Sequence, residues 1–97
     1  MLASRTIPAF DSYGNYSSDN YGAHTLRFTD PSGRDWYFSY RTLVAVYVPG
    51  EGLTVHRNDW GPTTGKHLNW IDGGLPEAKR ARLSPDDFRA YIETLPA

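Results

Sequence analysis

Several short stretches between residues 24 and 57 alternate apolar and polar side chains with a period of two. Residues 24–28 and 36–40 both show this alternation, which is typical of half-buried strands. The sequence Asp30-Pro31-Ser32-Gly33 separates them and favours a turn, because Pro presets its own backbone angle and Gly accepts positive φ. The two segments therefore predict a β-hairpin.

Two more strands are predicted after this hairpin. Residues 42–48 are almost wholly apolar and rich in β-branched side chains, which indicates a central strand buried on both faces. Pro49-Gly50-Glu51-Gly52 ends that strand, and residues 53–57 alternate again. The result is an antiparallel meander.

The C-terminal region instead has the period of a helix. Ser84-Pro85-Asp86-Asp87 combines an N-cap residue, a proline at the first helical position and two acids at the positive end of the helix dipole. Four apolar residues follow at helical spacing and form one stripe: Phe88, Tyr91, Ile92 and Leu95. We expect a helix over about residues 85–95.

The remaining segments have weaker signals. Residues 66–71 favour a short helix capped by Thr63 or Thr64, although a short strand is an alternative. Residues 79–83 read as a charged edge strand. The first 22 residues show neither period. We expect residues 1–12 to be flexible, and Tyr13, Tyr16 and Tyr21 belong either to this arm or to an extended segment laid on the domain surface.

Together these elements predict a single domain over residues 1–97. Its class is α+β: a small curved antiparallel sheet of about four to five strands with the C-terminal helix packed on it. The chain has no cysteine and a formal net charge of −1, so a thiolate site is excluded and strong nucleic-acid binding is not favoured. No apolar run approaches the roughly 20 residues of a membrane span, and the N-terminus does not resemble a signal peptide. We expect a cytoplasmic protein without a membrane partner.

The segment from Asn58 to Asp72 carries the strongest indication of a site. It places large aromatic residues and many hydrogen-bonding side chains around a Gly-Pro corner, a mixture used in recognition surfaces. An exposed Trp60 would suit a protein hot spot or base stacking, whereas a Trp60 that plugs the end of the sheet is equally open. The candidate binding residues are Asn58, Asp59, Trp60, Thr63, Thr64, Lys66, His67 and Asn69.

The sequence from Gly61 to His67 departs from a phosphate-binding P-loop. Only three residues separate Gly61 from Gly65, and His67 follows Lys66 where a Ser or Thr would hold magnesium. The amides of Thr64 and Gly65 could still bind an isolated phosphate if a helix starts there, but a tight turn at Gly65 is favoured. We expect no cofactor.

Catalytic and metal sites receive little support. The histidines, His24, His56 and His67, lack the spacing of a zinc motif, so we expect no metal. Asp59 and His67 could form an acid–base pair, but no nucleophile stands out. An enzyme is therefore not expected.

Three segments of the sequence resemble those of a known protein family. Residues 13–24, residues 37–45 and residues 58–69, the last with the run Thr63-Thr64-Gly65-Lys66-His67-Leu68-Asn69, resemble a family of small uncharacterised proteins encoded by bacteriophages, plasmids and some bacterial and archaeal genomes. The resemblance supplies no catalytic residues. It implies a phage or mobile-element origin, and it favours an ordered place in the fold for the N-terminal tyrosines.

Three functions follow as hypotheses. The first is a non-catalytic protein that binds a host or phage protein through the candidate residues. The second is a single-stranded nucleic-acid or nucleotide binder, in which Trp60 stacks and Lys66 or Arg57 meets phosphate. The third and weakest is a hydrolase built on Asp59 and His67. An exposed apolar sheet face could in addition make the protein a homodimer.

Overall fold

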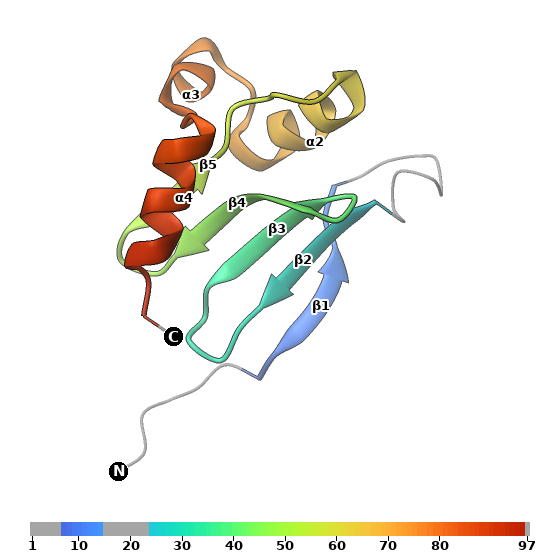
Figure 1. Cartoon of the computed structure of the whole chain (residues 1–97). Helices are drawn as coiled ribbons and strands as arrows, with labels where there is room; N and C mark the ends of the chain where they lie inside the picture. The colour runs from blue at the N-terminus through green and yellow to red at the C-terminus, as the bar shows by residue number, and fades with distance from the viewer. Residues whose placement is uncertain (1–6, 15–23, 97) are drawn as a thin grey trace.

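The computed structural model describes residues 7–14 and 24–96. Its centre is an open antiparallel sheet whose strands lie in chain order (Figure 1). The strands are β1 (Ala9–Ser12), β2 (Thr25–Thr29), β3 (Asp35–Ser39), β4 (Thr42–Val48) and β5 (Gly52–Val55). The predicted hairpin and the buried strand over residues 42–48 are confirmed.

Helices form the second half of the chain. They are α2 (Pro62–Asp72), α3 (Pro76–Ala81) and α4 (Pro85–Thr94). Ser84 caps α4 as predicted, because its hydroxyl accepts a hydrogen bond from the Asp87 amide at 3.2 Å. The predicted α+β class, an antiparallel sheet with a C-terminal helix, is confirmed.

A β-bulge in β4 shapes the core. Tyr37 of β3 pairs with Ala45, whereas the next residue of β3, Phe38, pairs with Leu43, so Val44 is the extra residue. A bulge bends its strand and redirects side chains. Val44 and Ala45 consequently enter the same buried cluster with Val55 of β5 and Leu68 of α2.

The helices divide between the two faces of the sheet. Leu68 of α2 packs on the face that carries Ala45 and Val55. Thr54 neighbours Val55 on β5 and therefore points to the opposite face. Tyr91 of α4 approaches Thr54, and Figure 1 shows α4 crossing the sheet over β4 and β5.

Two sequence predictions were wrong. Residues 9–12, assigned to a flexible arm, form edge strand β1, which pairs with β2 from Ala9↔Thr29 to Ser12↔Leu26. Residues 79–81, assigned to an edge strand, belong to helix α3, where Pro76 occupies an early helical position and Lys79 and Arg80 stand in the last turn, as the helix dipole favours. Tyr16 and Tyr21 lie outside the described residues.

The helix predicted over residues 66–71 is confirmed, but its start was misplaced. It begins at Pro62, and Gly61 is its N-cap residue, so neither Thr63 nor Thr64 caps it. Proline is well suited to the first turn, because it has no amide hydrogen to leave unpaired there. The Thr64 side chain is thereby available for a contact with the sheet.

Candidate functional site

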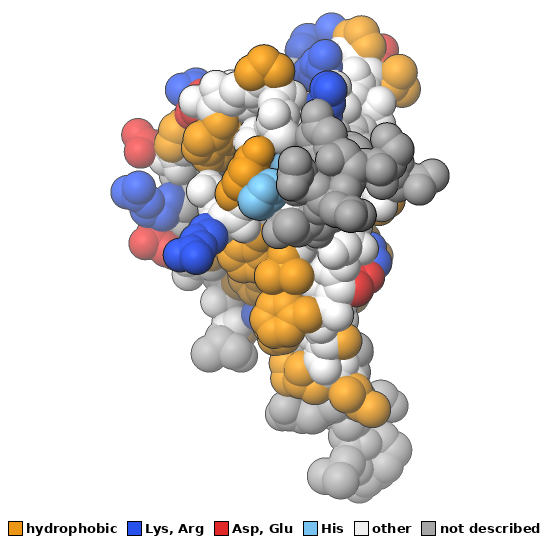
Figure 2. All heavy atoms as spheres, turned by 90° about the vertical axis from the view of Figure 1, so that its right-hand side faces the viewer, with side chains coloured by type: hydrophobic (Ala, Val, Ile, Leu, Met, Phe, Trp, Pro, Cys, Tyr) orange, Lys and Arg blue, Asp and Glu red, His pale blue; other side chains and the backbone are white. Residues whose placement is uncertain are grey.

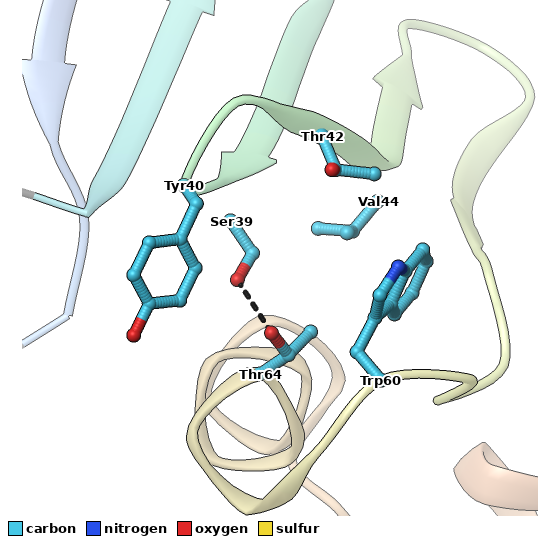
Figure 3. Close-up of a pocket in the computed structure, with 6 residues that line it drawn as sticks. All are labelled: Ser39, Tyr40, Thr42, Val44, Trp60 and Thr64. Carbon is cyan, nitrogen blue, oxygen red and sulfur yellow. Dashed lines mark hydrogen bonds between the residues drawn. The ribbon is translucent and has the colours of Figure 1, made fainter.

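A pocket of about 300 Å³ lies where the turn between β3 and β4 meets the start of α2. Tyr40 and Trp60 stand on opposite sides of it, with the hydroxyl side chains of Ser39 and Thr64 between them (Figure 3). Both aromatic residues are about half exposed, at 47% and 44%. The lining residues are Ser39, Tyr40, Thr42, Val44, Trp60 and Thr64.

A buried chain of hydrogen bonds forms the floor of the pocket. The hydroxyls of Ser39 and Thr64 lie 3.0 Å apart, and the Ser39 hydroxyl lies 2.7 Å from Nδ1 of His67. His67 is completely buried. Burial lowers the pKa of His67, and the charge of nearby His24 adds to this effect. The ring is therefore held neutral at physiological pH and joins α2 to β3.

Tyr40 forms one wall of the pocket from an unusual backbone conformation. Its φ is +57°, and among the described residues it is the one non-glycine residue with positive φ. Two-residue hairpin turns need positive φ and usually place Gly or Asn there. The ring of Tyr40 stacks on His24, with centroids 4.2 Å apart. A bulky residue at such a position indicates a site held by its surroundings.

Trp60 forms the other wall from the loop before α2. Asn58 fixes this loop, because its side-chain oxygen accepts from the Trp60 amide at 3.0 Å and its side-chain nitrogen donates to the Gly61 carbonyl at 3.2 Å. The indole packs against His56, with centroids 4.7 Å apart. Trp60 thus lines the pocket with one face and packs on His56.

A second hollow adjoins the pocket at the turn between β3 and β4. Its volume is about 550 Å³, and it is lined by His24, Tyr40, Arg41 and Thr42. The two hollows share Tyr40 and Thr42. The surface around the turn therefore combines aromatic rings and hydroxyls with one exposed cation, Arg41.

The structure places the eight predicted site residues in different surroundings. Trp60 and Thr64 line the pocket, while His67 and Asn58 support it from below and from the loop. Thr63 is half-buried and Lys66 is exposed on α2.

Asp59 and Asn69 instead bind neighbouring side chains. The Asp59 carboxylate accepts from Arg57 at 2.8 Å, and the Asn69 amide oxygen accepts from Arg82 at 3.0 Å. Asp59 therefore pairs with Arg57, whereas the buried His67 contacts Ser39. The structure does not bring Asp59 and His67 together as an acid–base pair.

The predicted tight turn at Gly65 was wrong, and the Gly65 amide is not available for a phosphate. Gly65 lies inside α2, and its amide donates to the Gly61 carbonyl at 2.9 Å as part of the helix. A Cβ at this position would lie 2.9 Å from the side-chain nitrogen of Asn58. A glycine here lets Asn58 lie against the first turn of α2.

Sequence reasoning missed the half of the pocket that comes from the sheet. Ser39, Tyr40, Thr42 and Val44 reach α2 only through the tertiary fold. One signal was present: the turn Ser39-Tyr40-Arg41-Thr42 has neither Gly nor Asn, which is unusual for a hairpin of this length.

Neutral His67 predicts a pH dependence of stability. Its folded pKa lies below the ordinary value of 6.5, so the unfolded chain binds a proton more readily. The free energy of unfolding should be highest above pH 6.5 and fall as the pH is lowered, by at most about 1.4 kcal/mol per pH unit for one proton. Urea unfolding at several pH values between about 5 and 8 measures this.

The matched variant is His67→Gln, which cannot titrate. Its free energy of unfolding should be nearly constant between about pH 5 and 8. The carboxyls of Asp30 and Asp72 have an ordinary pKa of 3.8, which the fold lowers further, so they stay ionised in the folded and unfolded chain over this range. A wild-type protein whose stability does not fall between pH 7 and pH 5 would contradict a neutral, buried His67.

The fold and the pocket define a small α+β protein with an aromatic-walled recess at one end of an open sheet. The chain belongs to a family of unknown function, DUF8033, whose profile matches residues 9–89. That span includes every strand and all the lining residues of the pocket. No curated protein and no solved structure matches the chain.

Two structural findings bear on the kind of site. Within residues 7–14 and 24–96, no group of three or more metal-ligating side chains could hold a metal ion. Across the same part of the chain, none of the helices has the length and apolar character needed to cross a membrane.

Proposed function

We propose that this protein is a non-catalytic binding protein whose pocket between Tyr40 and Trp60 receives an apolar or aromatic side chain of a partner protein. The observation that carries the proposal is the pair of half-exposed aromatic walls over a buried polar floor. Trp and Tyr are enriched among the residues that dominate binding energy in protein interfaces.

The size of the pocket favours a single anchoring side chain. A volume of about 300 Å³ is at the lower end of the range for small-molecule sites. Val44 supplies an apolar wall, and the hydroxyls of Ser39 and Thr64 already bond to each other. A side chain with little hydrogen-bonding demand fits this environment best.

Both aromatic walls are held in place before a partner arrives. His24 stacks on Tyr40 and His56 packs on Trp60, so each ring loses little conformational freedom on binding. Such preorganisation favours affinity because less ordering is needed in the complex. The resemblance to phage and mobile-element proteins supports a host or phage factor as the partner, met in the host cytoplasm.

Trp60→Ala should abolish capture of the partner while the domain stays folded. Loss of a central aromatic anchor commonly costs at least about 2 kcal/mol of binding, or roughly thirtyfold in affinity. The measurement is affinity capture from nuclease-treated host lysate with tagged protein, followed by comparison of the specifically retained proteins. Circular dichroism establishes that each variant is folded.

Trp70→Ala is the matched control, because Trp70 is exposed to almost the same extent, 45% against 44% for Trp60, but lies outside the pocket. It should retain the partner. If the folded Trp60→Ala protein captures the same proteins as wild type, the pocket is not the recognition site.

Single-stranded nucleic acid is a second candidate ligand, favoured by Arg41 in the hollow beside Tyr40. Stacking on Trp60 or Tyr40 with Arg41 at a phosphate would be the binding mode. It predicts quenching of tryptophan fluorescence by oligothymidylate that weakens as salt increases. If the quenching persists in the double variant Trp60→Phe/Tyr40→Ala, the nucleic acid binds elsewhere. If wild type shows no quenching at low salt, this binding mode is excluded.

A further inference from the structure

One half of a sheet face carries large apolar side chains that none of α2, α3 and α4 covers in the described part of the chain. Phe10, Phe28 and Trp36 pair across β1, β2 and β3, and Leu26 pairs with Phe38, which pairs with Leu43. Residues that pair directly point to the same face, as do residues two apart on a strand. We call this set the sheet patch: Phe10, Leu26, Phe28, Trp36, Phe38 and Leu43.

Helix α4 covers only the neighbouring part of this face. Val46, the partner of Trp36 on β4, is completely buried. Phe10 and Leu26 are 64% and 39% exposed. Figure 2 views the molecule from the β1 side and shows apolar side chains gathered along the sheet below the helices.

The opposite face of the same strands carries charged side chains at β1 and β2 and an aromatic ring at β3. Asp11 on β1 and Arg27 on β2 pair there and form an ion pair, and Arg27 lies over the ring of Tyr37 on β3. On that face Tyr37 also packs against the buried cluster that contains Leu68 of α2, so α2 reaches the opposite face of β3 but not the sheet patch. An apolar patch of a few hundred Å² is often functional in folded proteins.

We propose that the sheet patch is the interface of a homodimer in which two copies pack sheet face against sheet face. None of its six side chains is charged, so two copies of the patch can meet without bringing like charges together. The same absence of charge disfavours a strongly charged partner, because the patch has no opposite charge to pair with it. An interface that uses the same patch on both copies closes on itself as a twofold dimer. Two twisted sheets pack in this way about 10 Å apart.

The exposed area indicates a weak, reversible dimer. A phenylalanine exposes roughly 200 Å² when free, so Phe10 contributes roughly 130 Å² at 64% exposure. The other five residues are less exposed, and the whole patch offers a few hundred Å². A standard stable interface buries about 800 Å² on each partner, so the dimer should dissociate on dilution.

Sedimentation velocity of the full chain over a wide concentration range tests this dimer. Wild type should shift from the monomer mass to twice that mass as concentration rises. Leu26→Lys should weaken dimerisation at least about tenfold, because it places a charge within each copy of the interface. Leu75→Lys is the control: Leu75 is 63% exposed but lies between α2 and α3, and its dimer should be unchanged.

Other outcomes would overturn the proposal. A wild-type protein that is monomeric throughout has no such interface. Leu26 lies on β2, one strand in from the edge, so a dimer that survives Leu26→Lys would be formed elsewhere, for example by pairing of two β1 edges. Thermal unfolding establishes that Leu26→Lys is folded. Because the patch is separate from the pocket, partner capture through Trp60 should be unaffected by this variant.

Discussion

Replacing Arg82 with alanine is expected to lower the free energy of unfolding by about 3–5 kcal/mol. The Arg82 guanidinium binds Asp72 through two hydrogen bonds of 2.7 and 2.9 Å, and both side chains are more than 90% buried. Burial would raise the pKa of Asp72, but the bonds from Arg82 hold it below its ordinary value. Without Arg82, a buried carboxylate at the end of α2 loses its positively charged partner and keeps the hydrogen bond from the Gly74 amide. Urea unfolding at neutral pH measures the change.

An exposed ion pair in the same chain provides the comparison. Arg57 donates to Asp59 at 2.8 Å, but its side chain is 56% exposed, so Arg57→Ala should cost no more than about 1 kcal/mol. Replacing both buried partners, as in Asp72→Leu/Arg82→Met, should recover much of the loss. Equal costs for Arg82→Ala and Arg57→Ala would show that the buried pair does not fasten α2 to the end of α3.

Tyr13→Ala should destabilise the protein by about 3–5 kcal/mol, the range of large aromatic truncations in cores. Tyr13 is 1% exposed, although it follows the short edge strand β1. Its ring lies 5.3 Å from Tyr37 and 5.5 Å from Trp70, and its hydroxyl donates to the Phe38 carbonyl at 2.9 Å. It therefore ties the N-terminal strand to both β3 and α2. Chemical denaturation gives the size of the effect.

Two variants separate the contributions. Tyr13→Phe removes only the hydroxyl and should cost about 1 kcal/mol. Tyr47→Ala truncates a tyrosine that is 40% exposed and should cost clearly less than Tyr13→Ala. If Tyr13→Ala leaves the unfolding transition unchanged, the N-terminal segment is not part of the folded core.

The sequence was most informative where structure follows from neighbouring residues. Residues 42–48 have the apolar, β-branched composition of a buried strand, and β4 has those bounds. Ser84 and Pro85 identified the start of α4 for an equally local reason, because an N-cap and a proline act on the first turn alone. The α+β class follows from these elements together.

Short segments with no periodic pattern account for the errors. Strand β1 has only four exposed residues, and its formation depends on β2, which lies beyond the segment 15–23. Helix α3 has six residues and no buried ones, so it shows no periodic apolar face to distinguish it from a strand. In both cases the local pattern was too short to decide.

The pocket could be predicted from the sequence only in part, because its lining residues come from distant segments of the chain. Trp60 and Thr64 lie within one aromatic and polar segment that is visible in the sequence. Ser39 and Tyr40 join them only because the turn between β3 and β4 meets the start of α2. The bulge at Val44 likewise results from strand pairing, and no feature of a single strand specifies it.

The proposed function requires that an anchoring side chain bind in the pocket between Tyr40 and Trp60. The most direct measurement is a titration of the protein with uncharged N-acetylphenylalaninamide, followed through the three tryptophan indole resonances by NMR. We expect the Trp60 resonance to shift, with a dissociation constant on the order of 1 mM, and the shift to disappear in Tyr40→Ala. A Trp60 resonance that does not move, or that moves no more than those of Trp36 and Trp70, would contradict the assignment of this pocket.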